Sequence, residues 1–346
     1  MNRKYLLDFV IVACFVLAAV YYIRRNETPI ETVKPARSAP AKETPNLRIS
    51  RPPAFLRSNQ FASTRTAGIA GAKPEKTPAY VQEALNQQIA YDKRREAIAS
   101  ISDLSGSGAQ VAWADYLTRP LPCVDAGWWE QEYDLRNNML NKLREYSTDP
   151  GVVTEALLKI YANPDQGKVM RSYAIQHIAA WMNSGNPAAG DKDRLLDAVR
   201  DAAAKVDDPV IGGAGLIAMR DAGPQNEAGK MALSALDRGQ ACAEARISAF
   251  QVCAELGMNE ALSPARTALA DRNEPVILRM SAAALLARLG GDEDMRLLRE
   301  MSSGDGGSIS ARPADQNVSA ARHGSQEEFV RNAARFALAS RRSEGK

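Results

Sequence analysis

The chain has 346 residues, of which 45% are hydrophobic, 25% charged and 6% aromatic. These values suit about two domains and exclude a fully disordered chain, a multi-span membrane protein and a disulfide-rich scaffold. The formal net charge of +3 is unevenly placed, because residues 24–78 carry 11 Lys/Arg against 4 Asp/Glu, while the residues after them sum to −5.

The first element, residues 1–23, is expected to be a single membrane-spanning helix. Residues 5–23 form an apolar run of 19 residues interrupted by one charge, Asp8. A helix of that length rises about 28 Å, close to the thickness of a hydrocarbon core. Two alternatives are a signal peptide cleaved after Val16-Leu17-Ala18 and a lipobox-like Ile11-Val12-Ala13-Cys14, although the apolar run continues past both.

The orientation of this helix has two interpretations. A short basic N-terminal tail favours export of the remaining chain, whereas the larger number of Lys and Arg after the apolar run favours the opposite orientation. We expect a single-pass membrane protein whose folded part is exported to the periplasmic side, with the cytoplasmic side as the alternative.

Residues 24–78 form a basic linker. They hold 8 of the 18 prolines and show no amphipathic period, so the segment is expected to be disordered and to act as a tether. A basic strip of this kind can also be attracted to anionic lipid. Ile49, Phe55, Leu56 and Phe61 are a further candidate, a short docking motif for a partner.

Downstream of Pro78 the sequence predicts helices and no strands. Thr77-Pro78 is a cap followed by proline, and the acid–proline starts Asp149-Pro150, Asp208-Pro209 and Glu274-Pro275 repeat that arrangement. The fold class is therefore all-α. Residues 79–147 show no clear repeat and are expected to form an N-terminal helical cap.

A pattern recurs from residue 148 to the end of the chain. Each copy begins with an apolar residue followed directly by Arg. An Ala stands three residues after the Arg, and a second apolar residue stands four residues after the Ala. The copies are Met170-Arg171…Ala174…Ile178, Ala245-Arg246…Ala249…Cys253, Leu278-Arg279…Ala282…Leu286, Val330-Arg331…Ala334…Leu338 and a degenerate Ile211-Gly212…Gly215…Met219. Without two insertions, Ser184–Gly190 and the flexible stretch 302–325, the period is about 33–34 residues, which indicates an internal repeat.

These apolar-Arg-x-x-Ala cores and the Leu-Gly ends at Leu256-Gly257 and Leu289-Gly290 resemble the HEAT-repeat family, in particular its short bacterial form related to phycobiliprotein lyases. The resemblance covers about residues 150–342 and implies an α-solenoid of about five helix pairs. The family pattern also places an Asp about six residues before the Arg. Asp165 fits, but Gln240, Asn273 and Ser325 stand at the equivalent places, so a complete Asp–Arg ladder is not predicted.

Small residues in the repeats predict close contact between neighbouring helix pairs, at Ala174, Ala249, Ala282 and Ala334. The cluster Gly212, Gly213 and Gly215 has the same interpretation. A phosphate-binding loop is disfavoured for this cluster, because no strand precedes it and no Lys-Ser/Thr follows it.

The sequence predicts no metal, cofactor or catalytic site. His177 lies on an apolar face and is expected to be packed, whereas His323 falls in the insertion and is expected to be solvated. The cysteines lack metal-ligand spacing, and buried free thiols are expected. Those after the apolar N-terminal run are Cys123, Cys242 and Cys253.

Acidic clusters are expected to complement helix starts rather than to catalyse. They are Asp191/Asp193, Asp207/Asp208 and Asp292/Glu293/Asp294. Trp113, Trp128, Trp129 and Trp181 favour core packing, although the unusual stretch Pro120–Trp129 is a secondary candidate for binding. Nucleic-acid binding is disfavoured, since the repeat region is acidic and its basic residues are interspersed with acids.

The sequence thus predicts a membrane-tethered interaction scaffold without catalysis. Its partner is expected to be a protein or peptide, bound on the concave face formed by the second helices of the repeats. Two alternatives remain: a lyase- or chaperone-like enzyme by analogy with the phycobiliprotein lyases, and a structural component of the cell envelope. The oligomeric state is not predicted.

Overall fold

The computed structural model describes residues 78–121, 126–237, 239, 241–303 and 319–344. The predicted membrane helix 1–23 and linker 24–78 lie outside this part, apart from Pro78. The part of the chain that the structure describes is all-helical, as predicted, with two short 3-10 turns. Its α-helices are α2 (Ala79–Leu85), α3 (Tyr91–Ser100), α4 (Ser107–Thr118), α5 (Ala126–Tyr146), α6 (Pro150–Ala162), α7 (Gly167–Asn183), α8 (Ala189–Ala204), α9 (Ile211–Ala222), α10 (Gln225–Asp237), α11 (Ala243–Leu256), α12 (Leu262–Ala270), α13 (Val276–Leu289), α14 (Asp292–Ser303) and α15 (Ser319–Glu344).

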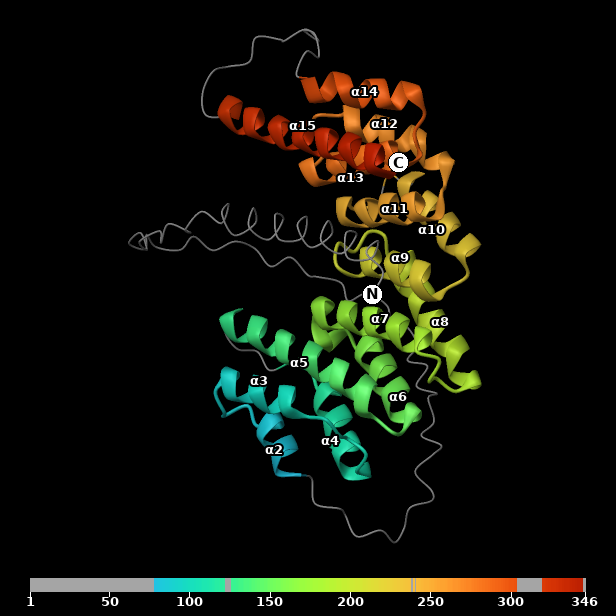
Figure 1. The fold of residues 1–346 in the computed structure, drawn as a ribbon. Helices are drawn as coiled ribbons and strands as arrows, with labels where there is room; N and C mark the ends of the chain where they lie inside the picture. Colours follow the sequence, from blue (N-terminus) through green and yellow to red (C-terminus); the bar gives the residue numbers. More distant parts are fainter. Residues whose placement is uncertain (1–77, 122–125, 238, 240, 304–318, 345–346) are drawn as a thin grey trace, which may run out of the picture. The chain divides into compact units, whose positions relative to one another are not determined.

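Consecutive helices pair as α2/α3, α4/α5 and so on to α14/α15, and each odd-numbered helix packs on the next odd-numbered one (Figure 1). The helices α3, α5, α7, α9, α11, α13 and α15 are called the odd layer below. The described residues after 147 hold five helix pairs, as expected, and the whole described part holds seven. The difference arises at residues 79–147, where α2 to α5 repeat the pairing of the later helices.

Local sequence explains the main helix boundaries. Asp149 caps α6 by accepting a hydrogen bond from the Gly151 amide at 2.9 Å, with Pro150 in the first turn. Asp208 caps α9 in the same way, accepting from Val210 and Ile211 at 3.0 and 3.1 Å. Glu274 does not cap α13; its carboxylate binds Arg246 instead.

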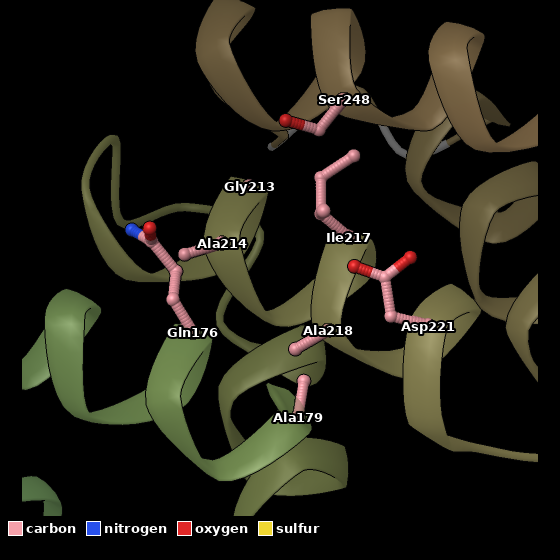
Figure 2. A pocket seen from close by; sticks show the side chains of 8 residues that line it. All are labelled: Gln176, Ala179, Gly213, Ala214, Ile217, Ala218, Asp221 and Ser248. Carbon is pink, nitrogen blue, oxygen red and sulfur yellow. The ribbon is translucent and has the colours of Figure 1, made fainter. Parts of the chain in front are cut away.

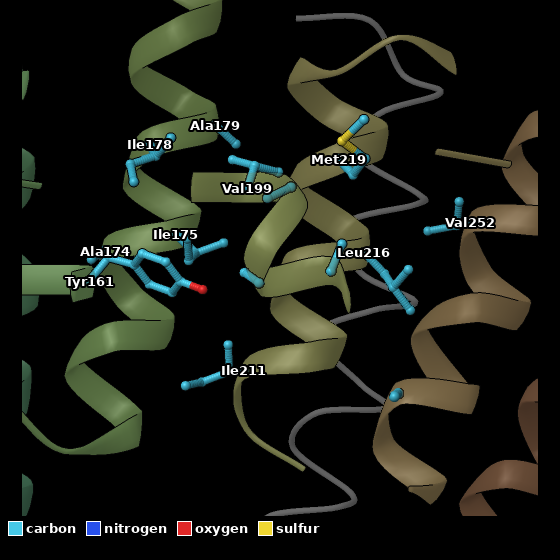
Figure 3. Packing of buried hydrophobic residues seen from close by; sticks show 14 of the residues in the cluster. Tyr161, Ala174, Ile175, Ile178, Ala179, Val199, Ile211, Leu216, Met219 and Val252 are labelled. Carbon is cyan, nitrogen blue, oxygen red and sulfur yellow. The ribbon is translucent and has the colours of Figure 1, made fainter. Parts of the chain in front are cut away.

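The core runs continuously between the two helices of each pair and from pair to pair. Apolar side chains from α7, α8, α9 and α11 meet there, including Ile175, Val199, Leu216 and Val252 (Figure 3). The four alanines of the repeat pattern are all fully buried, which confirms that small residues occupy the helix contacts.

One boundary differs from expectation. Helix α15 begins at Ser319, so residues 319–325 belong to this helix and not to the predicted insertion 302–325. Among the described residues, no helix combines the length and the apolar character needed to cross a membrane.

Candidate binding face

The repeat arginines bind the ends of the preceding helices. Arg94, Arg171 and Arg279 each donate a hydrogen bond from Nε to the carbonyl ten residues earlier, in the last turn of α2, α6 or α12. The last carbonyls of a helix lack partners within it and carry negative partial charge, so a guanidinium is a favourable cap. The distances are 3.0 Å to Ala84 O, 2.8 Å to Tyr161 O and 3.2 Å to Leu269 O respectively.

Two of the repeat arginines also bind an acid from the next repeat. Arg246 binds Glu274 at 2.6 Å, and Arg279 binds Glu327 at 2.6 Å. These glutamates stand five and four residues before the next arginine of the pattern, not six. Acid–arginine pairs between successive repeats are thus present here, but the acids are glutamates that do not stand at the six-residue spacing of the family pattern.

In the last repeat the capping role belongs to a different arginine from the one predicted. Arg335 donates to the carbonyl of Ser302 at the end of α14, at 3.0 Å, while Arg331 is exposed. Arg341, further along α15, donates to the carbonyls of Ala287 and Gly290 at 3.2 and 2.6 Å. Helix α15 is therefore joined to both α13 and α14 by guanidinium groups.

The first two pairs share a buried polar cluster. Glu132 on α5 accepts hydrogen bonds from Arg94 at 2.7 Å, Tyr116 at 2.6 Å and Arg136 at 3.2 Å. Arg136 also donates to the carbonyl of Arg119 at the end of α4, at 2.7 Å. All four clustered side chains are at most 7% exposed, and burial raises the pKa of the Tyr116 hydroxyl. The cluster is a satisfied structural network that joins α3, α4 and α5.

The glycine cluster of α9 permits close packing, as the sequence predicted. A Cβ on Gly212 would lie 2.3 Å from the Lys205 carbonyl oxygen, and one on Gly215 would lie 2.3 Å from the backbone nitrogen of Ala203. Gly213 faces the other neighbour, since its Cβ would lie 2.7 Å from Ser248 Oγ on α11. All three lie inside a helix, so the phosphate-loop alternative does not apply.

The packed environments predicted for His177 and Cys253 are confirmed, whereas Cys242 is more exposed than expected. His177 is 6% exposed and lies 2.9 Å from Asn137 Oδ1 through Nε2, and burial lowers its pKa to about 3. Cys253 is a buried free thiol whose pKa burial raises to about 12, and Cys242 is a half-buried free thiol. Cys123 and the side chain of His323 lie outside the described part.

The acidic clusters act at helix starts and in ion pairs. Asp208 caps α9 and binds Lys168 at 3.0 Å. Asp294 is 1% exposed and receives two hydrogen bonds from Arg266, at 2.6 and 2.9 Å. Asp191 binds Arg194 at 3.2 Å. No group of three His, Cys, Asp or Glu side chains suited to a metal ion occurs among the described residues.

The tryptophans divide into core and surface positions. Trp113 and Trp181 are buried, and their indole nitrogens donate to the Met139 carbonyl at 2.9 Å and to Thr154 Oγ1 at 3.2 Å, which confirms core packing for these two. Trp129 is half-buried and packs edge-on against Tyr133 with ring centroids 6.1 Å apart. Part of the secondary candidate Pro120–Trp129, residues 122–125, is outside the described part.

A pocket of about 410 Å³ opens on the odd layer between α7, α9 and α11 (Figure 2). Its walls are small or aliphatic: Ala179, Gly213, Ala214, Ile217 and Ala218. Polar groups stand around it on three different helices, Gln176 on α7, Asp221 on α9 and Ser248 on α11. Apolar walls with a few convergent polar groups are typical of a binding site.

Arginine and carboxylate groups define the charge at one edge of this pocket. Arg220 binds both Asp221 and Glu255, each at 2.6 Å, so one guanidinium serves two carboxylates. Glu244 is also exposed, and it lies one helical turn before the pocket residue Ser248 on α11, so the two share a face of this helix. The edge therefore carries an excess of negative charge and suits a basic group on a bound molecule.

Comparisons with known proteins add little to this picture. No family model matches the chain, and no curated protein matches it. One solved structure that matches is human deoxyhypusine hydroxylase in complex with glycerol, at 15% sequence identity, with 77% of this chain and 95% of that chain covered and a TM-score of 0.30. The helix pairs and their stacking in the described part of the chain define an all-α array of the solenoid kind.

Proposed function

We propose that this protein is a non-enzymatic interaction scaffold that binds a protein or peptide on the odd layer. The pocket between α7, α9 and α11 is the observation that carries this proposal, because it combines small apolar walls with polar groups from three helices. In a repeat array, the equivalent faces of neighbouring helix pairs lie side by side and form one extended binding surface.

The dimensions of the pocket favour a side chain over a large cofactor. Its 410 Å³ lies near the lower end of small-molecule sites, and it opens directly to the surface of the layer. Gln176 and Ser248 offer both donors and acceptors to a peptide backbone. The glycine contacts keep α8, α9 and α11 closely packed, so the walls are formed before any partner binds.

A filled pocket tests this proposal. Peptides selected from a displayed random 16-residue library against the full-length protein are titrated against the wild type and Ala214→Trp, whose indole occupies the pocket. Ala204→Trp, at an exposed position at the end of α8, is the matched control. The proposal predicts at least a tenfold loss of affinity for Ala214→Trp and none for the control. Equal binding by all three proteins would refute it.

The proposal includes tethering to a membrane through residues 1–23, with the helical array on the exported side. Its support is the 19-residue apolar run with basic residues on both sides. A C-terminal alkaline phosphatase fusion tests the placement, because the enzyme is active only after export. An active fusion that stays with the membrane fraction after carbonate extraction is expected; an inactive one would exclude the exported placement.

A further inference from the structure

The odd layer carries a second exposed feature, an apolar patch on α13 and α15. Ile277, Phe329 and Phe336 are 39%, 49% and 52% exposed, and these three residues are called the aromatic patch below. Helices α13 and α15 pack directly against each other. Exposed large apolar side chains that gather on neighbouring elements mark an interaction surface more often than scattered single ones.

Repeat position places the aromatic patch on the same face as the pocket. Ile277 and Phe329 each stand two residues before the arginine position of their repeat, and Phe336 stands five residues after it. The pocket residues Ile217 and Gln176 also stand five residues after the arginine position of theirs. Since each pair repeats the same packing, equivalent positions point to the same side of the odd layer.

The area of the aromatic patch argues against a second copy of this chain as its occupant. A large apolar side chain has an area of about 150–250 Å², so the exposed fractions leave on the order of 300 Å² or less across the three residues. A stable interface buries about 800 Å² on each partner. The aromatic patch alone is therefore suited to one or two anchoring side chains of a peptide.

Acidic residues on α11 lie between the two apolar features. Glu244 and Glu255 are exposed on this helix, and Asp221 lies beside Glu255 through their shared partner Arg220. Two helix spacings, about 16–20 Å, separate α9 from α13, and three spacings, about 24–30 Å, separate α9 from α15, which carries both phenylalanines. About five to nine extended residues span these distances.

We infer that the odd layer binds a linear peptide that has a small apolar residue at one end, Lys or Arg in the middle and an aromatic or aliphatic residue at the other end. The small apolar residue enters the pocket on α9, the basic residue faces Glu244 and Glu255, and the large residue packs on the aromatic patch. This inference rests on the proposed function and adds the chemical class of its partner.

The same displayed-peptide selection tests it with different variants. Enriched peptides are expected to share the order small apolar, basic, large apolar. Phe329→Ala/Phe336→Ala is expected to weaken their binding at least tenfold, and Glu244→Lys at least fivefold. Val111→Ala is the matched control, because Val111 is 56% exposed on α4, outside the odd layer. Unchanged thermal unfolding of each variant shows that folding is intact.

The outcomes separate the two proposals. Loss of binding with Ala214→Trp but not with the phenylalanine variant would overturn this inference and leave the proposed function standing. Binding that is indifferent to both variants, or a selection that enriches no peptide, would overturn both. Loss with the phenylalanine and Glu244 variants as well as with Ala214→Trp supports the peptide described here.

Discussion

The contact between α8 and α9 gives the sharpest test of the fold. Gly215→Ala adds one methyl group at a point where it would lie 2.3 Å from the Ala203 nitrogen and 2.4 Å from the Ala202 carbonyl carbon. Ordinary contacts of a Cβ begin near 3.4 Å, so the two helices must separate by about 1 Å. Both neighbours are backbone atoms, and a side-chain rotation cannot relieve the overlap.

Two opposing terms determine the size of the effect. Alanine is favoured over glycine in a helix interior by about 1 kcal/mol. Overpacking a buried contact costs about 1–3 kcal/mol, and here it also disturbs the α9–α11 contact at Gly213. We expect a net loss of up to about 2 kcal/mol in the free energy of unfolding.

Urea denaturation followed by circular dichroism measures this effect, with Gly190→Ala as the matched control. Gly190 also lies in a helix, but a Cβ there would meet nothing within 4 Å. The control is therefore expected to be neutral or stabilising. If Gly215→Ala raised the unfolding midpoint as much as Gly190→Ala, the close packing of α9 would not constrain the array and the reasoning would be wrong.

Three further predictions concern single side chains. Arg279→Met removes the hydrogen bonds to Glu327 and to the Leu269 carbonyl, and it should lower the free energy of unfolding by about 2–4 kcal/mol. In the same urea denaturation assay, the control Arg288→Met, at an exposed position, should change this free energy by less than about 0.5 kcal/mol. Equal effects of the two substitutions would contradict the structural role of Arg279. His177 has a folded-state pKa of about 3 and an ordinary value of 6.5, so its contribution is complete above pH 6.5 and is lost as pH falls toward 3. His177→Gln should therefore flatten the decline of stability between pH 6.5 and 5, and a wild-type imidazole that titrates near 6.5 by NMR would refute this. Burial raises the pKa of Cys253 to about 12, so iodoacetamide followed by peptide mapping should modify half-buried Cys242 well before Cys253. Equal modification of the two thiols in the native protein would show that the α11 core opens.

Sequence patterns predicted the helix pairs wherever the arginine pattern was complete. They missed the first two pairs for a local reason. Arg94 follows Lys93 instead of an apolar residue, and Met139 stands where the Arg136 copy would need alanine. The packing tolerates both changes, because the guanidinium still reaches the end of the preceding helix.

The acid partners of the repeat arginines stand outside the spacing that the family pattern predicts. Glu274 and Glu327 reach the arginine of the preceding repeat from a spacing of five or four residues, since a glutamate side chain is one methylene longer than aspartate and accepts a different spacing. A pattern that requires aspartate six residues before the arginine therefore includes neither Glu274 nor Glu327.

The pocket could not be predicted from sequence. Its lining comes from three helices spread over residues 176–248, and its shape depends on how closely α9 approaches its neighbours. The glycine cluster did indicate close packing, but small residues alone do not say whether neighbouring side chains fill the space that they leave. The exposed aromatic patch could not be predicted either, because apolar residues of α15 lie both on the side that is buried against α13 and on the side that is exposed.

The glycine at position 212 has a consequence for how the array responds to salt. Most joints along the chain use a guanidinium where α9 has Gly212, and two of those groups, on Arg246 and Arg279, pair with the partly exposed carboxylates of Glu274 and Glu327. Ions screen such pairs, with a decay length of about 10 Å at 0.1 M. The joint at α8 and α9 relies on shape and is insensitive to ionic strength. Rising salt should therefore weaken the guanidinium–carboxylate joints between α11 and α13 and between α13 and α15, and leave the glycine contact of α8 with α9 unchanged.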